Sequence, residues 1–138
     1  MLKLDIGSGD REHWYSEDPE WVHLDCEPYE GVIVWECPEK IPVKNKSVDE
    51  VYIGQFLIEI HPETQLELAK ELVRVMKETG VIKVHCYNGI LGFPEFFVYL
   101  RSRGWHVDKD ELVNRYVDDG VVMETYLIEL RRVKGENL

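Results

Sequence analysis

The residues best suited to bind a ligand stand at the end of the first apolar segment of the chain. Asp5 lies in that segment, and the turn Gly7-Ser8-Gly9-Asp10 follows it directly. Glycines in such a turn let the backbone approach a bound molecule closely. Glu12 stands where the dinucleotide-binding pattern requires its third glycine, and an acid there disfavours pyrophosphate. The turn therefore predicts a site for a cationic group, an ammonium or a sulfonium, rather than for NAD or ATP.

Polar residues also follow each of the next three apolar segments. They are Asp25, then Glu36 or Cys37, then Gly54 and Gln55. If these segments are parallel strands, their carboxyl ends meet at one edge of a sheet, which is where open α/β sheets bind ligands. A carboxylate such as Asp25 can accept two hydrogen bonds from the diol of a ribose. The alternative reading is that these acids are loop residues of an acidic protein.

The segment Leu4-Asp5-Ile6-Gly7-Ser8-Gly9 resembles motif I of the class I S-adenosylmethionine-dependent methyltransferases. Later segments are similar to further motifs of that family, in the family's order. These segments are Val22-His23-Leu24-Asp25, the stretch over residues 41–51, Phe56-Leu57-Ile58-Glu59-Ile60-His61, and Leu72-Val73-Arg74-Val75-Met76-Lys77-Glu78-Thr79-Gly80. The resemblance covers about residues 2–86.

The resemblance implies that Asp5, Gly7 and Gly9 hold the methionine part of S-adenosylmethionine. Ser8 and Asp10 would lie in the same loop. It also implies that Asp25 binds the ribose hydroxyls of that cofactor.

For the adenine end, the resemblance implies that Cys26 lies beside the ring. An acid after the third strand would contact the adenine amine, and its register is open between Glu36 and Cys37, with Glu36 favoured. Gln55 would line the passage between cofactor and substrate.

The sequence departs from the family's pattern at several positions. Arg11 replaces the third glycine of the longer glycine motif, and Ile60 replaces a histidine, with His61 next to it. Glu78 and Thr79 replace a proline and a glycine. The chain is also short for the family, which puts substrate recognition in doubt.

Methyl transfer requires above all that donor and acceptor be held in line, and it requires a general base only if the acceptor loses a proton. The candidates for that base are Glu59, His61, His85 and Tyr87. Three of them also have a structural reading: His61 as a helix cap, His85 as a buried hydrogen-bonded residue, Glu59 as a support for its loop. No catalytic residue is assigned from the sequence.

The charge of the chain excludes several classes of partner. Sixteen Lys and Arg against 27 Asp and Glu leave a net charge of −11, which argues against binding nucleic acid or an anionic membrane. Gly54-Gln55-Phe56-Leu57 stands where enzymes that methylate DNA bases carry an Asn-Pro-Pro-Tyr or Asp-Pro-Pro-Tyr segment.

The three cysteines show no zinc-ligand spacing. We therefore expect reduced thiols, no metal, no membrane segment and a cytoplasmic protein.

Strand and helix signals alternate along the chain, which predicts an α/β fold. Strands are expected at residues 2–6, 21–25, 31–35, 48–53 and 81–86, helices from Pro62 to a cap at Gly80 and over residues 94–103, and two long strands at 105–117 and 121–133 around Asp119-Gly120. The prediction is a Rossmann-like three-layer sandwich. Its mostly parallel seven-stranded sheet would have a C-terminal antiparallel hairpin and a shortened first crossover. Residues 1–138 would form one minimal domain.

Two functions fit these expectations. The first is methyl transfer from S-adenosylmethionine to a small molecule or to a group carried by a partner protein. The second is a non-catalytic module of the same fold that serves as a regulatory or scaffold subunit. The aromatic stretch Phe93, Phe96, Phe97 and Tyr99 is expected in the core, with a contact in a homodimer as its alternative.

Overall fold

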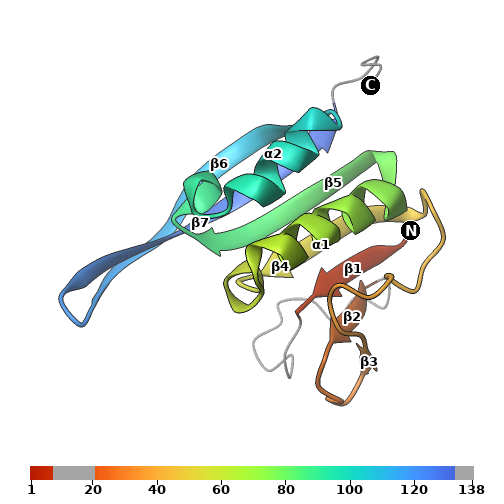
Figure 1. Ribbon diagram of the computed structural model, residues 1–138, viewed down its shortest axis with the longest axis horizontal. Coiled ribbons are helices and arrows are strands. Elements are labelled where there is room, and N and C mark those ends of the chain that lie inside the picture. The colour runs from red at the N-terminus through yellow and green to blue at the C-terminus, as the bar shows by residue number, and fades with distance from the viewer. Residues whose placement is uncertain (8–20, 133–138) are drawn as a thin grey trace.

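A computed structural model describes residues 1–7 and 21–132 of the chain, and its strands form one seven-stranded sheet (Figure 1). The strands are β1 (Lys3–Ile6), β2 (Trp21–Asp25), β3 (Val32–Val34), β4 (Val48–Gly54), β5 (Met76–Tyr87), β6 (Trp105–Asp118) and β7 (Val121–Arg132). Their order is β3-β2-β1-β4-β5-β7-β6. The first five run parallel, and β7 pairs antiparallel with both β5 and β6. The predicted mostly parallel sheet with a closing hairpin is confirmed.

Two helices, α1 (Pro62–Val75) and α2 (Pro94–Ser102), lie against each other on one face of the sheet (Figure 1). Alternate strand residues point at them, so that Val51 and Ile53 are fully buried in the core. Phe96 and Phe97 of α2 are fully buried as well, which confirms the core reading of the aromatic stretch. The described residues thus supply two of the three predicted layers. The predicted short crossover, over residues 10–20, lies outside them.

The end of α1 differs from the prediction. Gly80 was expected to cap this helix, but α1 ends at Val75, and Met76 already pairs with Val48 as the first residue of β5. The last carbonyls of the helix accept hydrogen bonds from the chain before β4, from the amides of residues 46 and 47, at 3.0 and 2.8 Å. Strand pairing and this external cap therefore end the helix before Gly80 is reached.

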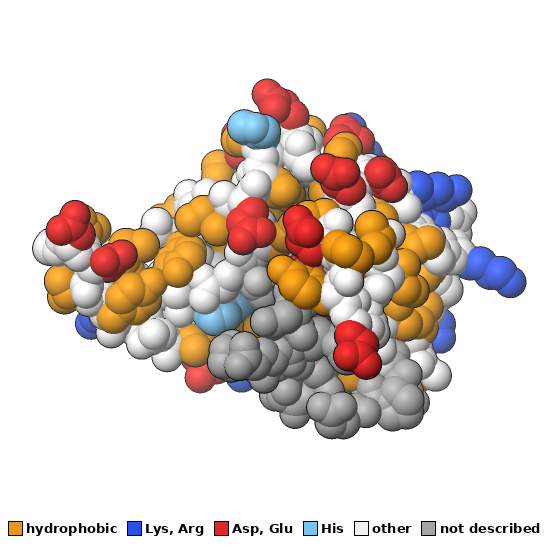
Figure 2. Space-filling model, turned by 90° about the horizontal axis from the view of Figure 1, so that it is seen from below, with side chains coloured by type: hydrophobic (Ala, Val, Ile, Leu, Met, Phe, Trp, Pro, Cys, Tyr) orange, Lys and Arg blue, Asp and Glu red, His pale blue; other side chains and the backbone are white. Residues whose placement is uncertain are grey.

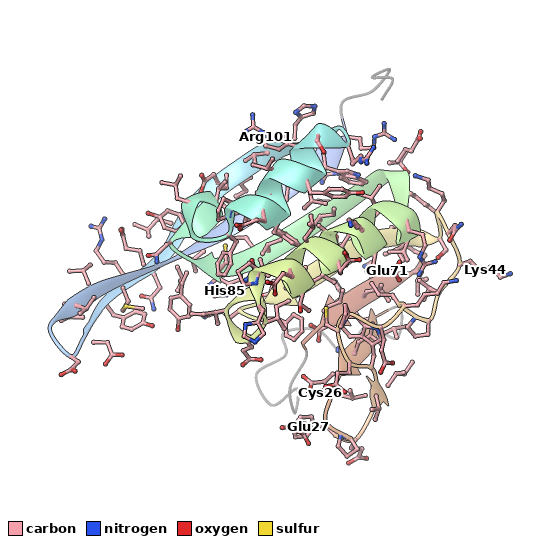
Figure 3. All side chains as sticks on the ribbon, viewed as in Figure 1. Cys26, Glu27, Lys44, Glu71, His85 and Arg101 are labelled. Atoms are coloured by element: carbon pink, nitrogen blue, oxygen red, sulfur yellow. The ribbon has the colours of Figure 1, made fainter. Side chains whose placement is uncertain are left out.

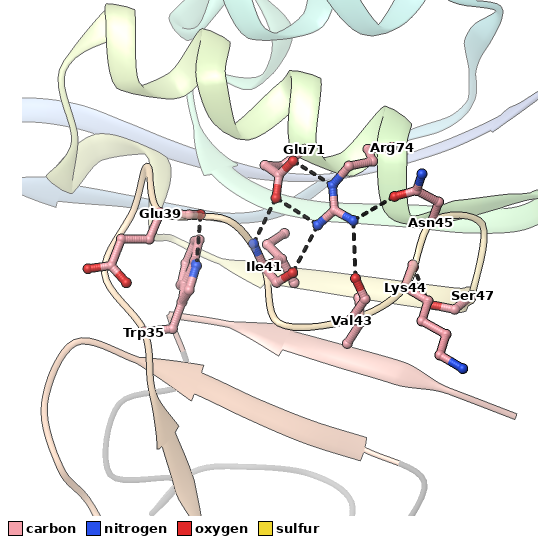
Figure 4. A network of polar contacts seen from close by, with 9 residues as sticks. All are labelled: Trp35, Glu39, Ile41, Val43, Lys44, Asn45, Ser47, Glu71 and Arg74. Carbon is pink, nitrogen blue, oxygen red and sulfur yellow. Dashed lines mark hydrogen bonds and ion pairs between the residues drawn. The ribbon is translucent and has the colours of Figure 1, made fainter.

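Arg74 holds the connection between β3 and β4 against α1 (Figure 4). Its guanidinium donates to the carbonyls of Ile41 at 2.9 Å and Val43 at 3.1 Å, and to Oδ1 of Asn45 at 2.8 Å. Glu71 orients the guanidinium through Nε at 2.7 Å and accepts a hydrogen bond from the amide of Ile41, also at 2.7 Å. This network gives the irregular connection a fixed path across the helix.

The face of the sheet opposite α1 and α2 carries polar side chains, and we call it the polar face. Because directly paired residues on neighbouring strands share a face, one row crosses it from β2 to β7. The row consists of His23, Asp5, Tyr52, Lys83 and Glu129. Alternation of apolar and polar residues along each strand therefore gives the sheet one core face and one face rich in ionisable groups.

The hairpin of β6 and β7 extends past the end of β5 (Figure 1). Its turn residues Asp119 and Gly120 both have positive φ, at 50° and 79°, as the predicted two-residue hairpin turn requires. Hydrophobic side chains gather on this projection (Figure 2), among them the exposed Val117, Val121 and Val122. Within the described ranges, no helix is long and apolar enough to span a membrane.

Candidate functional site

A pocket of about 190 Å³ opens where the carboxyl ends of β1 to β4 meet. Its lining consists of Gly7, Asp25, Cys26, Trp35, Glu36, Cys37, Phe56, Glu59 and Ile60. Gly7, Asp25, Cys26, Glu36 and Cys37 belong to the predicted cofactor-binding residues, and they come from segments far apart in the sequence. The structure thus brings together at one edge of the sheet what the sequence shows only as separate strand ends.

Gly7 forms the floor of the pocket at the end of β1. Its φ is +73°, and a Cβ added to it would lie 2.7 Å from the ring of Phe56. Its amide donates to the carbonyl of Leu24 at 2.9 Å, which joins this turn to β2. Both the backbone conformation and the close approach of Phe56 therefore require glycine at this position.

Asp25 ends β2 on the wall of the pocket. One carboxylate oxygen accepts a hydrogen bond from the amide of Glu27 at 3.0 Å, an Asx turn that fixes the side chain. The carbonyl of Asp25 accepts from the amide of Trp35 at 2.8 Å, which ties β2 to the segment after β3. A carboxylate held in this way is preorganised to accept hydrogen bonds from a ligand.

Two thiols line the pocket. Cys26 is exposed on the loop after β2, where Figure 3 labels it beside Glu27, and Cys37 is half-buried. Burial, and then the nearby Glu71 carboxylate, raise the pKa of Cys37 to about 12. Desolvation, followed by the charge of Asp25, raises the pKa of Cys26 above its ordinary value. Both thiols are therefore protonated and uncharged at neutral pH, and the acids carry the negative charge of the pocket.

The adenine-contacting position stays open between two residues, because both Glu36 and Cys37 line the pocket. Glu36 is exposed, whereas Cys37 is half-buried against the core. The predicted preference for Glu36 is neither supported nor contradicted by this placement.

Sequence reasoning missed the apolar walls of the pocket. Trp35, Phe56 and Ile60 line it, and the indole of Trp35 is anchored by a hydrogen bond to the carbonyl of Glu39 at 2.9 Å. The sequence signal that could have revealed these walls is the presence of large apolar residues directly after a strand. Glu59, predicted as a candidate base or as a support for its loop, also lines this pocket.

Two of the predicted cofactor residues, Asp5 and Gln55, are not among the residues that line the pocket. The carboxylate of Asp5 is buried on the polar face, where it accepts a hydrogen bond from Nδ1 of His23 at 2.6 Å. Gln55 has a left-handed backbone, with φ of 53°, and its amide donates to the carbonyl of His85 at 2.8 Å. Ser8, Gly9 and Asp10 lie outside the described residues.

The candidates for a general base are dispersed. His61 is the exposed N-cap residue of α1, and its side chain makes no cap hydrogen bond. The hydroxyl of Tyr87 lies 3.0 Å from that of Tyr116 on β6. Nε2 of His85 is buried and finds no hydrogen-bond partner in the described part of the chain. Burial lowers the pKa of His85, so its imidazole is neutral at neutral pH.

The charges of the pocket select against anionic ligands. Asp25, Glu36 and Glu59 contribute carboxylates, and no Lys or Arg lines the pocket as described. Within residues 1–7 and 21–132, no cluster of three or more His, Cys, Asp or Glu side chains could hold a metal ion. The arrangement suits a ligand that combines hydroxyl groups, a flat ring for the apolar walls and a positive charge.

No family model matches the sequence, and no curated protein matches it. Solved structures do match. A SAM-dependent methyltransferase from Archaeoglobus fulgidus superposes with a TM-score of 0.70 at 18% identity, over 95% of this chain and 86% of that chain. The 1,6-didemethyltoxoflavin-N1-methyltransferase of Burkholderia thailandensis, solved with S-adenosylhomocysteine bound, gives a TM-score of 0.70 at 13% identity, over 96% and 71% of the two chains. The cyclase SpnF gives 0.64 at 13% identity, over 95% and 74%.

At these identities the likeness shows the fold, which is that of the class I S-adenosylmethionine-dependent methyltransferases. The fold predicted from the sequence motifs is therefore confirmed. Because one protein of this fold is named as a cyclase, the activity has to be argued from the site itself.

Proposed function

We propose that this chain binds S-adenosylmethionine in the pocket at the carboxyl ends of β1 to β4 and transfers its methyl group to an acceptor. The acceptor is a small molecule or a group carried by a partner protein. The observation that carries this proposal is the placement of Asp25, fixed by its Asx turn in a pocket whose lining, over residues 1–7 and 21–132, holds acids and no Lys or Arg. Such a pocket repels phosphates and accepts a cationic, ribose-bearing ligand.

Each part of the ligand has residues of matching chemistry. Asp25 would accept hydrogen bonds from the ribose hydroxyls. Trp35 and Ile60 would pack against the adenine, beside Cys26. Glu36 or Cys37 would face the adenine amine. The methionine part is assigned from the sequence to the turn of Gly7, Ser8, Gly9 and Asp10.

S-adenosylmethionine supplies a methyl group on a sulfonium, which is a reactive electrophile when held in line with a nucleophile. The protein's own contribution is orientation. The Asx turn at Asp25 and the hydrogen bond from Gly7 to Leu24 fix the pocket walls. Asp5 would act indirectly, by holding β1 and β2 together through His23.

Calorimetric titration with S-adenosylmethionine, S-adenosylhomocysteine, ATP and NAD tests the cofactor assignment. We expect binding of the first two in the micromolar range and none of the others; no binding of either up to about 1 mM would sink the proposal. Binding without methyl transfer to a broad panel of acceptors, together with capture of a partner protein, would instead favour the non-catalytic regulatory or scaffold subunit.

A further inference from the structure

A second cavity, of about 390 Å³, lies on the polar face and is not part of the pocket described above. Its lining consists of Tyr52, Lys83, His85, Val113 and Leu127. The register places these residues on one face, because Tyr52 pairs with Lys83 and His85 pairs with Leu127. The volume falls in the range of about 300–1,000 Å³ that is typical of small-molecule sites.

The two cavities lie next to each other across β4. His85 pairs with Gly54 on β4, and Ile53, the residue before Gly54, pairs with Ile6 on β1. Gly7, in the floor of the first pocket, directly follows Ile6. At about 4.8 Å between neighbouring strands, the backbones of Gly7 and His85 are roughly 10 Å apart. The two cavities are therefore about two strand spacings apart at the same end of the sheet.

Gly54 shapes the boundary between the cavities. A Cβ added to Gly54 would lie 2.9 Å from the ring of Tyr52. The Tyr52 ring therefore lies over the end of β4, and Tyr52 lines the second cavity.

The cavity has apolar walls and two nitrogen-bearing side chains. Val113 is the extra residue where the pairing of β6 with β7 shifts between Leu112 and Asn114, and together with Leu127 it supplies apolar surface. Lys83 makes a loose ion pair with Glu50, at 3.6 Å. A bulge of this kind re-aims a side chain and is common beside active sites.

Polar atoms without partners face this side of the sheet. They are Nε2 of His85 and Oγ1 of Thr125, both buried and both without a hydrogen-bond partner among the residues that the structure describes. Thr125 is 2% exposed, and it shares the polar face with His85 because its pairing partner is Tyr87. Buried polar atoms are almost always paired, and His85 lines the cavity, so its unpaired ring nitrogen points to a partner that the described residues do not supply.

We propose that the second cavity binds the methyl acceptor, that the acceptor is a phenol, and that His85 takes its proton. This rests on the proposed function. The aromatic ring would lie against Tyr52 and Leu127, with its hydroxyl hydrogen-bonded to Nε2 of His85. A primary amine, cationic at neutral pH, would be repelled by Lys83, and a carboxylate would leave the imidazole with no proton to accept.

The proposed methyl transfer accounts for every bond, proton and electron pair. The phenolic O–H bond breaks, its proton passes to His85, and the oxygen lone pair forms the new O–CH₃ bond. The S–CH₃ bond of the donor breaks with its electron pair staying on sulfur, so the sulfonium becomes a neutral thioether. The ammonium of Lys83 stabilises the negative charge that develops on the phenolic oxygen.

The test uses 2-naphthol and its methyl ether, 2-methoxynaphthalene, titrated by NMR into the full chain without cofactor. We expect 2-naphthol to bind with perturbation of the His85 ring signals and to bind about tenfold tighter than the ether. Leu127→Trp fills the cavity and should weaken 2-naphthol at least about tenfold, whereas Leu112→Trp, on the other side of the same hairpin, should change it by less than about twofold.

His85→Leu provides a second variant in case Leu127→Trp fails to fold. It should remove the preference for 2-naphthol over the ether. S-adenosylhomocysteine is titrated separately into each variant and should bind all of them as it binds the unaltered chain. Absence of that binding would refute the donor assignment alone. Failure of 2-naphthol to bind, or equal binding to the chain and to its Leu127→Trp and His85→Leu variants, would overturn the acceptor assignment.

Discussion

The carboxylate of Asp5 and Nδ1 of His23 lie 2.6 Å apart on neighbouring strands, and both side chains are buried. Since a carboxylate accepts only, the imidazole donates through Nδ1. The contact joins β1 to β2 directly beneath the proposed cofactor site. Asp5 therefore has a structural partner in addition to the role that the methyltransferase resemblance implies for it.

The first prediction concerns this pair. Asp5→Ala should destabilise the fold by about 1–3 kcal/mol, because it removes the carboxylate to which the buried imidazole of His23 donates. In a double-mutant cycle by urea unfolding, Asp5→Ala and His23→Ala should show a coupling of about 1–3 kcal/mol. Asp110→Ala removes an exposed acid and serves as the control. Purely additive effects of the two substitutions would contradict a direct interaction.

The second prediction concerns Asp25. Asp25→Ala should weaken binding of S-adenosylhomocysteine by about 1–3 kcal/mol, because hydrogen bonds from the ribose to a charged group are lost. Glu30→Ala makes the same change of charge in the exposed loop after β2 and should leave the affinity unchanged. Calorimetric titration measures both. Equal affinities for the two variants would remove Asp25 from the site.

The third prediction uses the thiols. Cys26 is exposed, whereas burial raises the pKa values of Cys37 and Cys86 to about 12. Iodoacetamide at about pH 8.5 should therefore label Cys26 first in the folded chain. S-adenosylhomocysteine should slow that labelling, since Cys26 lines the proposed site. Mass spectrometry of the peptides identifies the labelled residue. Labelling of Cys26 at the same rate with and without the ligand would place the ligand elsewhere.

The fourth prediction separates backbone strain from steric crowding. Gly7 and Gly120 both have positive φ, but a Cβ on Gly7 would lie 2.7 Å from Phe56, and one on Gly120 would meet nothing within 4 Å. Gly120→Ala should therefore cost about 1–2 kcal/mol of strain. Gly7→Ala should cost a further 1–3 kcal/mol, approximately, from overpacking, and it should also weaken S-adenosylhomocysteine. Similar losses of stability in thermal unfolding would argue against the close contact.

The fifth prediction is a dependence of stability on pH. The hydrogen bond from Arg74, and then that from the amide of Ile41, hold the pKa of Glu71 below its ordinary value despite partial burial. A lowered pKa in the folded state stabilises the fold above the ordinary carboxyl pKa of about 4.3, and that stability is lost as the pH falls through the lowered value.

Glu71→Gln should therefore cost about 1–3 kcal/mol at pH 7 and remove this part of the acid transition. Glu67→Gln breaks only an exposed pair with Lys70 and should cost less than about 0.5 kcal/mol. Urea unfolding at pH 7 and at pH 3 measures the difference. A Glu71→Gln variant that keeps the full acid dependence would contradict this account.

The strand ends could be predicted from the sequence because their signals are local. Asp25 follows a short apolar run, and Asp119-Gly120 is a hairpin turn by composition alone. The end of α1 could not be predicted in this way. Its periodicity continues to Met76, but pairing of Met76 with Val48, residues distant in sequence, begins β5 there. Local capping signals at Gly80 compete with long-range strand pairing, and the pairing prevails.

The candidate site, too, could be predicted where the signal is local and not where it depends on long-range pairing. The types of Asp25, Cys26 and Glu36 indicated a ligand site, since they follow strands that end at one edge. The structural role of Asp5, its hydrogen bond with His23, could not be predicted. It depends on which face of β1 Asp5 occupies and on a histidine on β2, and no spacing in the sequence indicates this contact. The second cavity depended on an irregularity in the pairing of β6, which moves Val113 and has no local signature.

The hydrogen bond from the amide of Gln55 to the carbonyl of His85 has one more consequence. It belongs to the backbone, so the spacing between the two cavities is set by peptide groups and is indifferent to side-chain identity. Replacements at Tyr52, Val113 or Leu127 would then retune which molecule is accepted while the donor stays where it was. Under the two proposed assignments, single substitutions could change the acceptor without displacing the donor.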